Sequence, residues 1–241
     1  MLKKIGIAVL AVVGLAVAAQ VLLYTVDGHA IAETGRFLSD ARYRVDEQRD
    51  GGFVFRPSHP NGRGLVVMHG ALIEPRSYAN TAAFFAGRGY TVFLPAGAMR
   101  LSITAVDDAA ARLGEFDVDD WYFIGHSMGG LAVLELLRRN AAEVRAVALW
   151  AARMPFDFSD VDVPILFLWG NDDGLLTADG LASAKTRLPA ATRYVTVDGG
   201  NHRNFAMYSH QFFDNDGTLD WREQIAFANE RTAAFFESPA D

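Results

Sequence analysis

Hydrophobic and polar positions alternate in blocks along the chain from residue 51 onward. Seven short apolar runs have the length of strands, and most are continuously apolar, as in strands buried on both faces of a sheet: residues 53–55, 65–68, 91–94, 121–124, 146–150, 165–169 and 194–197. Helical patterns lie between and after them, over residues 78–88, 103–113, 128–140, 178–188 and 223–236. The alternation predicts an α/β fold with a mostly parallel sheet and helices on both faces.

These elements predict a single globular domain over residues 51–241. The chain has 241 residues, no internal repeat and no second domain boundary. Only about ten residues, 154–163, separate two successive predicted strands. We therefore expect no large inserted cap over the sheet.

The N-terminus has a different pattern. Lys3 and Lys4 precede residues 5–24, of which 17 are apolar. Twenty residues in a helix reach ~30 Å, the thickness of the hydrocarbon layer. Acidic residues follow at Asp27, Glu33 and Asp40, a charge distribution that favours an N-terminus inside and a domain outside the cytoplasm. Residues 1–26 are thus predicted to form an N-terminal transmembrane helix that acts as a signal-anchor.

A cleaved signal peptide is the alternative for residues 1–26. Ala16-Val17-Ala18 offers a small-residue cleavage site, but the apolar run continues to Tyr24, which a cleaved peptide does not need. A buried soluble helix would need no lysine flank. Both exported alternatives place the globular domain outside the cytoplasm. Residues 27–50 are polar and charged, and we expect a partly helical tether there.

Composition narrows the function classes. The formal net charge is −7 and no Lys/Arg cluster is present, so we expect no nucleic-acid partner. The absence of cysteine excludes a disulfide framework, a zinc ribbon and a cysteine nucleophile. No zinc spacing or dinucleotide fingerprint occurs, and we expect no cofactor or metal.

One segment is similar to half of a calcium loop. With Gly217 aligned to the invariant glycine, Asp214, Asp216 and Glu223 fall at ligand positions, but Phe212 stands where the first aspartate is required. This mismatch favours a polar surface turn. The aromatic residues that precede it, Phe205, Tyr208, Phe212 and Phe213, could wall a pocket, but packing against the last helix is favoured.

The most informative motif is Gly125-His126-Ser127-Met128-Gly129, which fits G-x-S-x-G. It follows a predicted buried strand and opens a predicted helix, the context of a nucleophile elbow. A sharp turn there lifts the serine hydroxyl out of the sheet, and close backbone packing requires glycine on both sides. We interpret Ser127 as a nucleophile rather than as a helix-capping serine.

A serine nucleophile needs a base and an acid that orients the base, and the expected chain order is serine, acid, histidine. Asp173 lies in the loop after the strand at 165–169, and His202 in the loop after the strand at 194–197. Both loops leave carboxyl ends of strands, where open α/β sheets bind ligands. Asp172 and Asp157 stay open as alternative acids. His210 is a further candidate to line the site.

The oxyanion of an acyl-transfer reaction needs two backbone N–H donors. The Met128 N–H is one candidate, since it follows the nucleophile at a helix N-terminus. The second is the Ala71 N–H, in the loop that begins His69-Gly70 after the strand at 65–68.

Four stretches carry a family resemblance: HGALIEPRSY (69–78), GHSMGG (125–130), GNDDGLLT (170–177) and GGNHRNF (199–205). From about Gly51 to the C-terminus the chain resembles the α/β-hydrolases, and within them the compact, capless esterases grouped with dienelactone hydrolase. The resemblance implies that Ser127 is the nucleophile, Asp173 the acid and His202 the base. Dienelactone hydrolase itself uses a cysteine nucleophile, which this chain lacks.

The sequence therefore predicts a membrane-tethered serine hydrolase that cleaves a carboxylic ester, thioester or lactone of a small-molecule acyl substrate. A binding protein that keeps the fold without catalysis is the alternative. An acyltransferase or a cofactor-free haloperoxidase-type activity would use the same three residues.

Overall fold

The computed structural model describes residues 14, 21–22, 24–140 and 144–239. Eight strands form one sheet in the order β1-β2-β4-β3-β5-β6-β7-β8. Their bounds are β1 (Tyr43–Glu47), β2 (Phe53–Pro57), β3 (Arg63–Met68), β4 (Thr91–Leu94), β5 (Asp120–His126), β6 (Val144–Trp150), β7 (Ile165–Gly170) and β8 (Arg193–Val197). Strands β3 to β8 run parallel, and β2 pairs antiparallel with both β1 and β4. The seven predicted strands and the mostly parallel sheet are confirmed.

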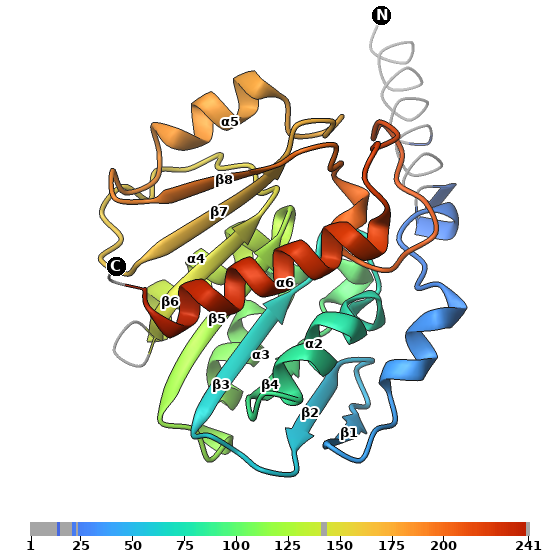
Figure 1. The fold of residues 1–241 in the computed structure, drawn as a ribbon, viewed down its shortest axis with the longest axis vertical. Coiled ribbons are helices and arrows are strands. Elements are labelled where there is room, and N and C mark those ends of the chain that lie inside the picture. Colours follow the sequence, from blue (N-terminus) through green and yellow to red (C-terminus); the bar gives the residue numbers. More distant parts are fainter. Residues whose placement is uncertain (1–13, 15–20, 23, 141–143, 240–241) are drawn as a thin grey trace, which may run out of the picture.

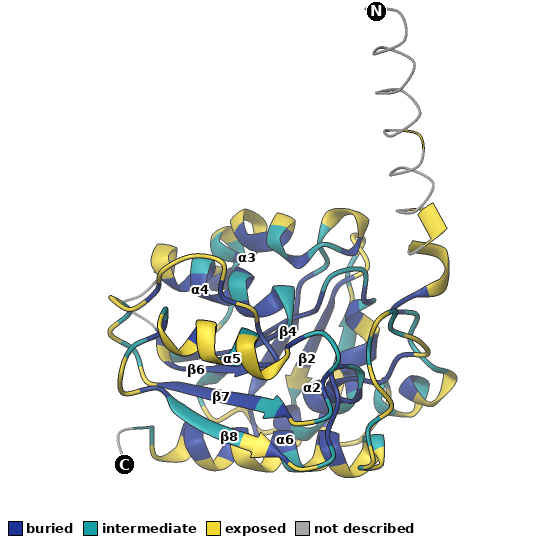
Figure 2. Cartoon of the chain, turned by 90° about the horizontal axis from the view of Figure 1, so that it is seen from above, coloured by how far each residue is buried: buried dark blue, intermediate teal, exposed yellow. Residues whose placement is uncertain are grey.

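Helices cover both faces of this sheet. Figure 2 shows α3 (Val106–Arg112), α4 (Met128–Asn140) and α5 (Ala178–Lys185) on one side and α6 (Trp221–Glu237) on the other. The helix α2 (Ala79–Ala86) contacts α6, and α3 contacts α4. Short 3-10 helices complete the described fold: η1 (Ala32–Phe37), η2 (Pro75–Tyr78), η3 (Ala98–Arg100), η4 (Ser102–Ala105), η5 (Leu113–Glu115) and η7 (Arg203–Phe205).

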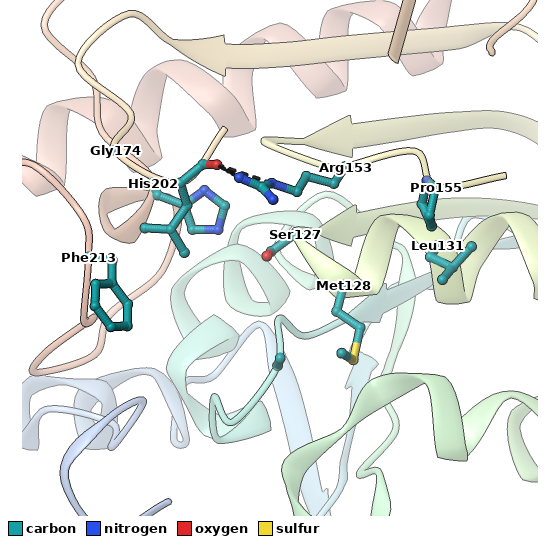
Figure 3. Close-up of a pocket in the computed structure, with 10 residues that line it drawn as sticks. Ser127, Met128, Leu131, Arg153, Pro155, Gly174, His202 and Phe213 are labelled. Carbon is teal, nitrogen blue, oxygen red and sulfur yellow. Dashed lines mark hydrogen bonds between the residues drawn. The ribbon is translucent and has the colours of Figure 1, made fainter. Parts of the chain in front are cut away.

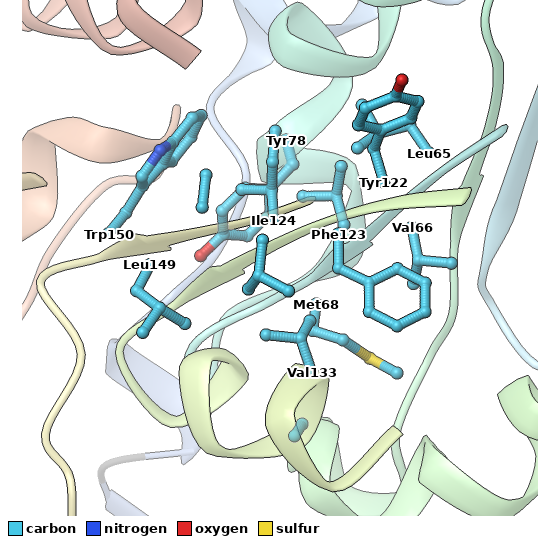
Figure 4. Close-up of a cluster of buried hydrophobic side chains, with 14 of the residues drawn as sticks. Leu65, Val66, Met68, Tyr78, Tyr122, Phe123, Ile124, Val133, Leu149 and Trp150 are labelled. Atoms are coloured by element: carbon cyan, nitrogen blue, oxygen red, sulfur yellow. The ribbon is translucent and has the colours of Figure 1, made fainter. Parts of the chain in front are cut away.

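The core lies between the central strands and these two helical layers. Side chains of β3, β5 and β6 are buried on both faces, which explains why their sequences are continuously apolar. Figure 4 shows part of this cluster, where Val133 of α4 lies near Ile124 and Met68. The central strands are rigidly packed, so the loops at their carboxyl ends have fixed starting points.

The folded unit begins earlier than the predicted boundary at residue 51. Residues 27–50, for which the sequence predicts a tether, include η1 and the edge strand β1, and Asp27 is buried. In β1 only Tyr43 is buried, because one side of an edge strand faces water. Its charged residues conceal the strand pattern, and the tether interpretation is corrected.

Two further expectations concern the connections and the N-terminus. Residues 151–164, between β6 and β7, hold no helix or strand, as expected for a fold without a large cap.

Within the described part of the chain, no helix has both the length and the apolar character needed to cross a membrane. The predicted transmembrane helix over residues 5–24 falls almost entirely outside the described residues and stays a prediction.

Candidate active site

The loops that follow β3, β5, β6, β7 and β8 meet around one pocket at the carboxyl edge of the sheet. Its volume is about 480 Å³. Figure 3 shows the pocket, which is lined by Ala71, Ser127, Met128, Leu131, Arg153, Pro155, Gly174, Leu175, His202 and Phe213. Four of the five predicted site residues are in this lining. The fifth, Asp173, lies directly behind it, next to Gly174.

Ser127 occupies a sharp turn between β5 and α4. Its φ is +54°, in the left-handed region. This region costs free energy for any residue that has a side chain. A Cβ on Gly125 would lie 2.3 Å from the Gly129 carbonyl oxygen, and one on Gly129 would lie 2.1 Å from the Met68 oxygen. Both contacts are impossible, which explains the two glycines of the motif. The turn presents the Ser127 side chain to the pocket.

His202 and Asp173 form a buried pair. His202 Nδ1 lies 2.9 Å from Asp173 Oδ2, and both side chains are almost completely inaccessible to water. The other carboxylate oxygen, Oδ1, accepts backbone hydrogen bonds from Leu175 N at 2.8 Å and Leu176 N at 2.6 Å. Because the carboxylate only accepts, Nδ1 carries the proton and Nε2 is left as the basic nitrogen.

The alternative acids lie elsewhere. Asp172 Oδ2 accepts hydrogen bonds from Thr218, and the exposed Asp157 accepts one from Ser159. Neither bonds to His202.

No hydrogen bond joins Ser127 to His202 in the part of the chain that the structure describes, although both side chains line the pocket. In substrate-free sites this bond often forms only when substrate is present.

The two residues with the predicted oxyanion donors, Met128 and Ala71, both line the pocket. Met128 is the first residue of α4, where helical N–H groups have no intrahelical acceptor. Ala71 follows Gly70, whose carbonyl oxygen accepts a hydrogen bond from His69 Nδ1 at 2.7 Å. In a trans peptide the N–H points opposite to the C=O. The hydrogen bond from His69 fixes the direction of the Gly70 carbonyl, and with it the opposite direction of the Ala71 N–H.

A buried hydrogen-bond relay joins this loop to His202. The Gly70 N–H donates to the Tyr78 hydroxyl at 3.0 Å, Tyr78 donates to His126 Nδ1 at 2.7 Å, and His126 Nε2 donates to the His202 carbonyl at 3.1 Å. The ends are a fixed donor and a fixed acceptor, which sets every direction between them. We call Gly70, Tyr78, His126 and His202 the buried relay. Sequence analysis did not identify Tyr78 or His126 as functional.

The two buried histidines beneath the site are held neutral. Burial lowers the pKa of His69 to about 4, because the charged form would lose its hydration. Burial likewise lowers the pKa of His126 well below its usual value, with a smaller contribution from His202. Both rings accept at one nitrogen and donate at the other, which requires the neutral form. His126 does so within the relay. His69, outside the relay, donates from Nδ1 to the Gly70 carbonyl and accepts at Nε2 from Gly97 N at 3.3 Å.

Asp214 ties the loop that contains Asp173 to the loop that contains His202. Its carboxylate accepts hydrogen bonds from three backbone N–H groups of these loops: Gly174 at 3.0 Å, His202 at 3.2 Å and Arg203 at 2.7 Å. In the described part of the chain, no group of three or more acidic or histidine residues is arranged to hold a metal ion. We call Asp214 the loop clamp, because its carboxylate links the two loops through these hydrogen bonds.

The remaining candidates have different positions. Phe213 lines the pocket and is 82% exposed, so the prediction that it packs against the last helix is wrong, whereas Phe205 and Tyr208 are buried. His210 binds Asp27, with 2.5 Å between Nδ1 and Oδ1. Arg153, which sequence analysis missed, extends across the pocket and donates from Nε to the Leu175 carbonyl at 3.1 Å (Figure 3).

Comparisons with known proteins agree with this architecture. A predicted CIB-like hydrolase from Thermoplasma acidophilum shares 16% identity with a TM-score of 0.59, over 80% of this chain and 99% of that chain. The naproxen esterase (carboxylesterase NP) of Bacillus subtilis shares 17% identity with a TM-score of 0.56, over 85% of this chain and 94% of that chain. At such identities the likeness shows the fold alone.

No curated protein matches the chain in sequence. The model of the alpha/beta hydrolase family matches residues 64–226, more than half of the chain. This range contains the elbow and the loops that carry Asp173 and His202. The chain therefore belongs to the alpha/beta hydrolase family, as its four sequence motifs predict.

Proposed function

We propose that the protein is a serine hydrolase that cleaves carboxylic esters, with thioesters and lactones as related substrates. The observation that carries this proposal is the buried Asp173–His202 pair beside Ser127, which occupies a strained turn in the wall of the same pocket. A binding protein has no need for an oriented base next to a serine that lines the pocket. The fold likeness to a solved naproxen esterase is consistent with an ester substrate.

The reaction would proceed through an acyl-enzyme. His202 Nε2 takes the proton of the Ser127 hydroxyl as its oxygen attacks the acyl carbonyl. The carbonyl oxygen gains negative charge and is stabilised by the N–H groups of Met128 and Ala71. His202 then gives the proton to the leaving oxygen. In the second half, His202 takes a proton from water as the water oxygen attacks the acyl carbon. His202 then returns this proton to the Ser127 oxygen as the acyl–oxygen bond breaks, and the carboxylic acid product leaves.

Asp173 would act by holding His202. Its Oδ2 accepts from Nδ1, which keeps the basic nitrogen free and stabilises the imidazolium that forms when Ser127 loses its proton. The two backbone N–H groups on Oδ1 keep the carboxylate in place. The apolar side chains of Leu131, Pro155 and Leu175 suit an acyl chain in the pocket.

We also propose that residues 1–26 anchor the hydrolase in a membrane with the folded domain outside the cytoplasm. The support is the sequence of residues 5–24, apolar at 17 of 20 positions and preceded by two lysines.

The direct test is hydrolysis of a panel of 4-nitrophenyl esters, from acetyl to dodecanoyl, by the full-length chain in detergent. Ser127→Ala should lower kcat/KM by ~10³-fold or more while the unfolding temperature stays near that of the wild type. Ser183→Ala, at an exposed position of α5, is the matched control and should retain full activity. Turnover that survives in Ser127→Ala would exclude this mechanism, and a folded wild type inert to the whole panel would favour a binding role.

A further inference from the structure

The exposed apolar side chains of the described residues gather at one edge of the molecule. Outside residues 21–26, the large hydrophobic side chains that are exposed are Met99 at 61%, Phe156 at 59% and Phe213 at 82%. They follow β4, β6 and β8, so all three lie at the carboxyl edge of the parallel strands, where the pocket opens. We call these three residues the apolar rim. Isolated exposed apolar residues are ordinary, but their confinement to the edge of the pocket is not.

The rim directly adjoins the pocket. Phe213 is part of the pocket lining, and Phe156 follows the lining residue Pro155. Met99 precedes Arg100, whose carbonyl oxygen accepts a hydrogen bond from Leu72 N at 2.7 Å, one residue beyond the lining residue Ala71. A surface that contacted all three side chains would therefore cover the entrance to Ser127.

Backbone strain accompanies this exposure. Phe213 has a φ of +67° and Met99 a φ of +53°, conformations that are outliers for large side chains. Burial does not compensate the strain, since both side chains are largely exposed. Strained residues persist where the surroundings enforce them, and they cluster at functional sites.

The N-terminal apolar segment ends between the loop that carries Met99 and the loop that carries Phe213. Arg100, next to Met99, donates hydrogen bonds to the carbonyl oxygens of Tyr24 and Asp27, and its guanidinium lies 3.9 Å from the Tyr24 ring centre. The buried Asp27 carboxylate accepts from His210 Nδ1 and from Phe212 N, next to Phe213. The end of the apolar sequence 5–24 is thus held at the edge of the molecule that carries the pocket.

We propose that the apolar rim lies in the surface of a lipid bilayer and that the acyl substrate reaches Ser127 from that bilayer. Twenty residues of bilayer length end at Tyr24, and side chains suited to the acyl–headgroup boundary surround the pocket on the same edge. The substrate class is then a membrane-borne acyl ester. The substrate part of this inference rests on the proposed ester hydrolysis, whereas the lipid contact does not.

The absence of cysteine allows a clean test of lipid contact. The full-length chain would carry one cysteine, by Met99→Cys, Phe156→Cys or Phe213→Cys, labelled with NBD and reconstituted into phosphatidylcholine vesicles with nitroxide on the acyl chains. His59→Cys is the control, because His59 is exposed in the loop between β2 and β3 at the opposite edge. The rim labels should lose about half or more of their emission, as expected for groups buried ~5–10 Å into the interface, and the control label should lose little.

Three results would overturn the lipid contact: rim labels quenched no more than the control, a chain that does not sediment with the vesicles, or rim labels already shielded without vesicles. The last would assign the rim to a second copy of the chain. Strong quenching with no hydrolysis of any ester would overturn the proposed hydrolase and retain the lipid contact.

A second measurement tests the source of substrate. The double variant Met99→Ser, Phe156→Ser changes two rim residues that do not line the pocket. Its kcat/KM should match the wild type on water-soluble 4-nitrophenyl acetate and fall about fivefold or more on 4-nitrophenyl palmitate in vesicles, because apolar contact with lipid is lost. Equal rates on the palmitate ester, or an equal fall on both esters, would contradict entry from the bilayer.

Discussion

The floor of the pocket and its apolar rim are built in opposite ways. On the floor, the polar groups of the buried relay are closed from water and joined by directed hydrogen bonds, and the buried His126 is neutral. The rim is apolar, exposed and in part conformationally strained. We propose that the difference separates two tasks: the floor would hold the reacting groups in position, and the rim would determine which substrates reach them. Floor variants should then alter turnover of every substrate alike, whereas rim variants should discriminate between dissolved and membrane-borne esters.

The largest effect is expected from the acid. Asp173→Asn replaces an acceptor of the His202 Nδ1 proton with an amide that can donate, which favours the wrong tautomer. We expect kcat to fall by ~10³- to 10⁴-fold on soluble and vesicle-borne esters alike. Steady-state kinetics would measure this, with Asp172→Asn as the matched control on the neighbouring residue. A comparable loss in Asp172→Asn, or none in Asp173→Asn, would assign the acid elsewhere.

The next largest effect concerns the free energy of unfolding of the protein at low pH. Folding lowers the pKa of His69 from 6.5 to about 4, so the unfolded chain binds a proton first as the pH falls through this window. This contribution to stability is fully present above about pH 6.5 and is lost progressively down to about pH 4. Between pH 7 and pH 5, His69 should lower the free energy of unfolding by on the order of 2 kcal/mol.

Urea unfolding of the full-length chain at pH 7 and pH 5 would measure this loss. His69→Gln should show a smaller difference between the two pH values than the wild type, even where its stability at pH 7 is lower. His59→Gln, at an exposed position, should parallel the wild type. A His69→Gln profile as steep as that of the wild type would mean that other groups cause the acid sensitivity.

The buried relay should contribute a smaller share of turnover. Tyr78→Phe removes the hydroxyl and leaves the Gly70 N–H and His126 Nδ1 without their partner. We expect kcat to fall ~10-fold with little change in KM, because the oxyanion loop and the base lose their connection, together with ~1–3 kcal/mol of stability. Tyr43→Phe removes a buried hydroxyl that bonds the Phe37 carbonyl away from the site, and should lower stability alone. A change in KM without a change in kcat would argue for a role in binding.

The smallest effect is expected from the loop clamp. Asp214→Asn keeps one acceptor oxygen but weakens the hold on the N–H groups of Gly174, His202 and Arg203. A fall in kcat of ~3- to 10-fold would follow from losing charge-assisted hydrogen bonds. Asp216→Asn, an exposed neighbour in the same loop, should retain wild-type kcat. Equal values for the two variants would remove Asp214 from the account.

Much of the fold could be predicted because its signals are local. The central strands are continuously apolar since both faces are buried, and the elbow needs its glycines within five residues of chain. The edge strand β1 was missed because three of its five residues, Arg44, Asp46 and Glu47, are charged and none of these three is buried.

Contacts between residues that lie far apart in the sequence could not be predicted. Tyr78 and His126 are separated by 48 positions, and nothing in either local pattern indicates that they meet. Asp214 resembles a surface turn until the loops that donate to it are placed around it. Phe213 could not be assigned to the pocket, because its exposure depends on the path of the whole loop between β8 and α6. Local motifs therefore predicted the candidate site residues, whereas the residues that hold them in position could not be predicted.

The central claim is that His202 activates Ser127 as a nucleophile. A fluorophosphonate reacts only with such a serine, so the most direct measurement is its adduct on the full-length chain, located by mass spectrometry and timed beside His202→Gln. We predict one adduct, on Ser127, whose formation slows by ~10²-fold or more in His202→Gln. No adduct on the folded wild type, or an adduct that forms equally fast without His202, would contradict the account.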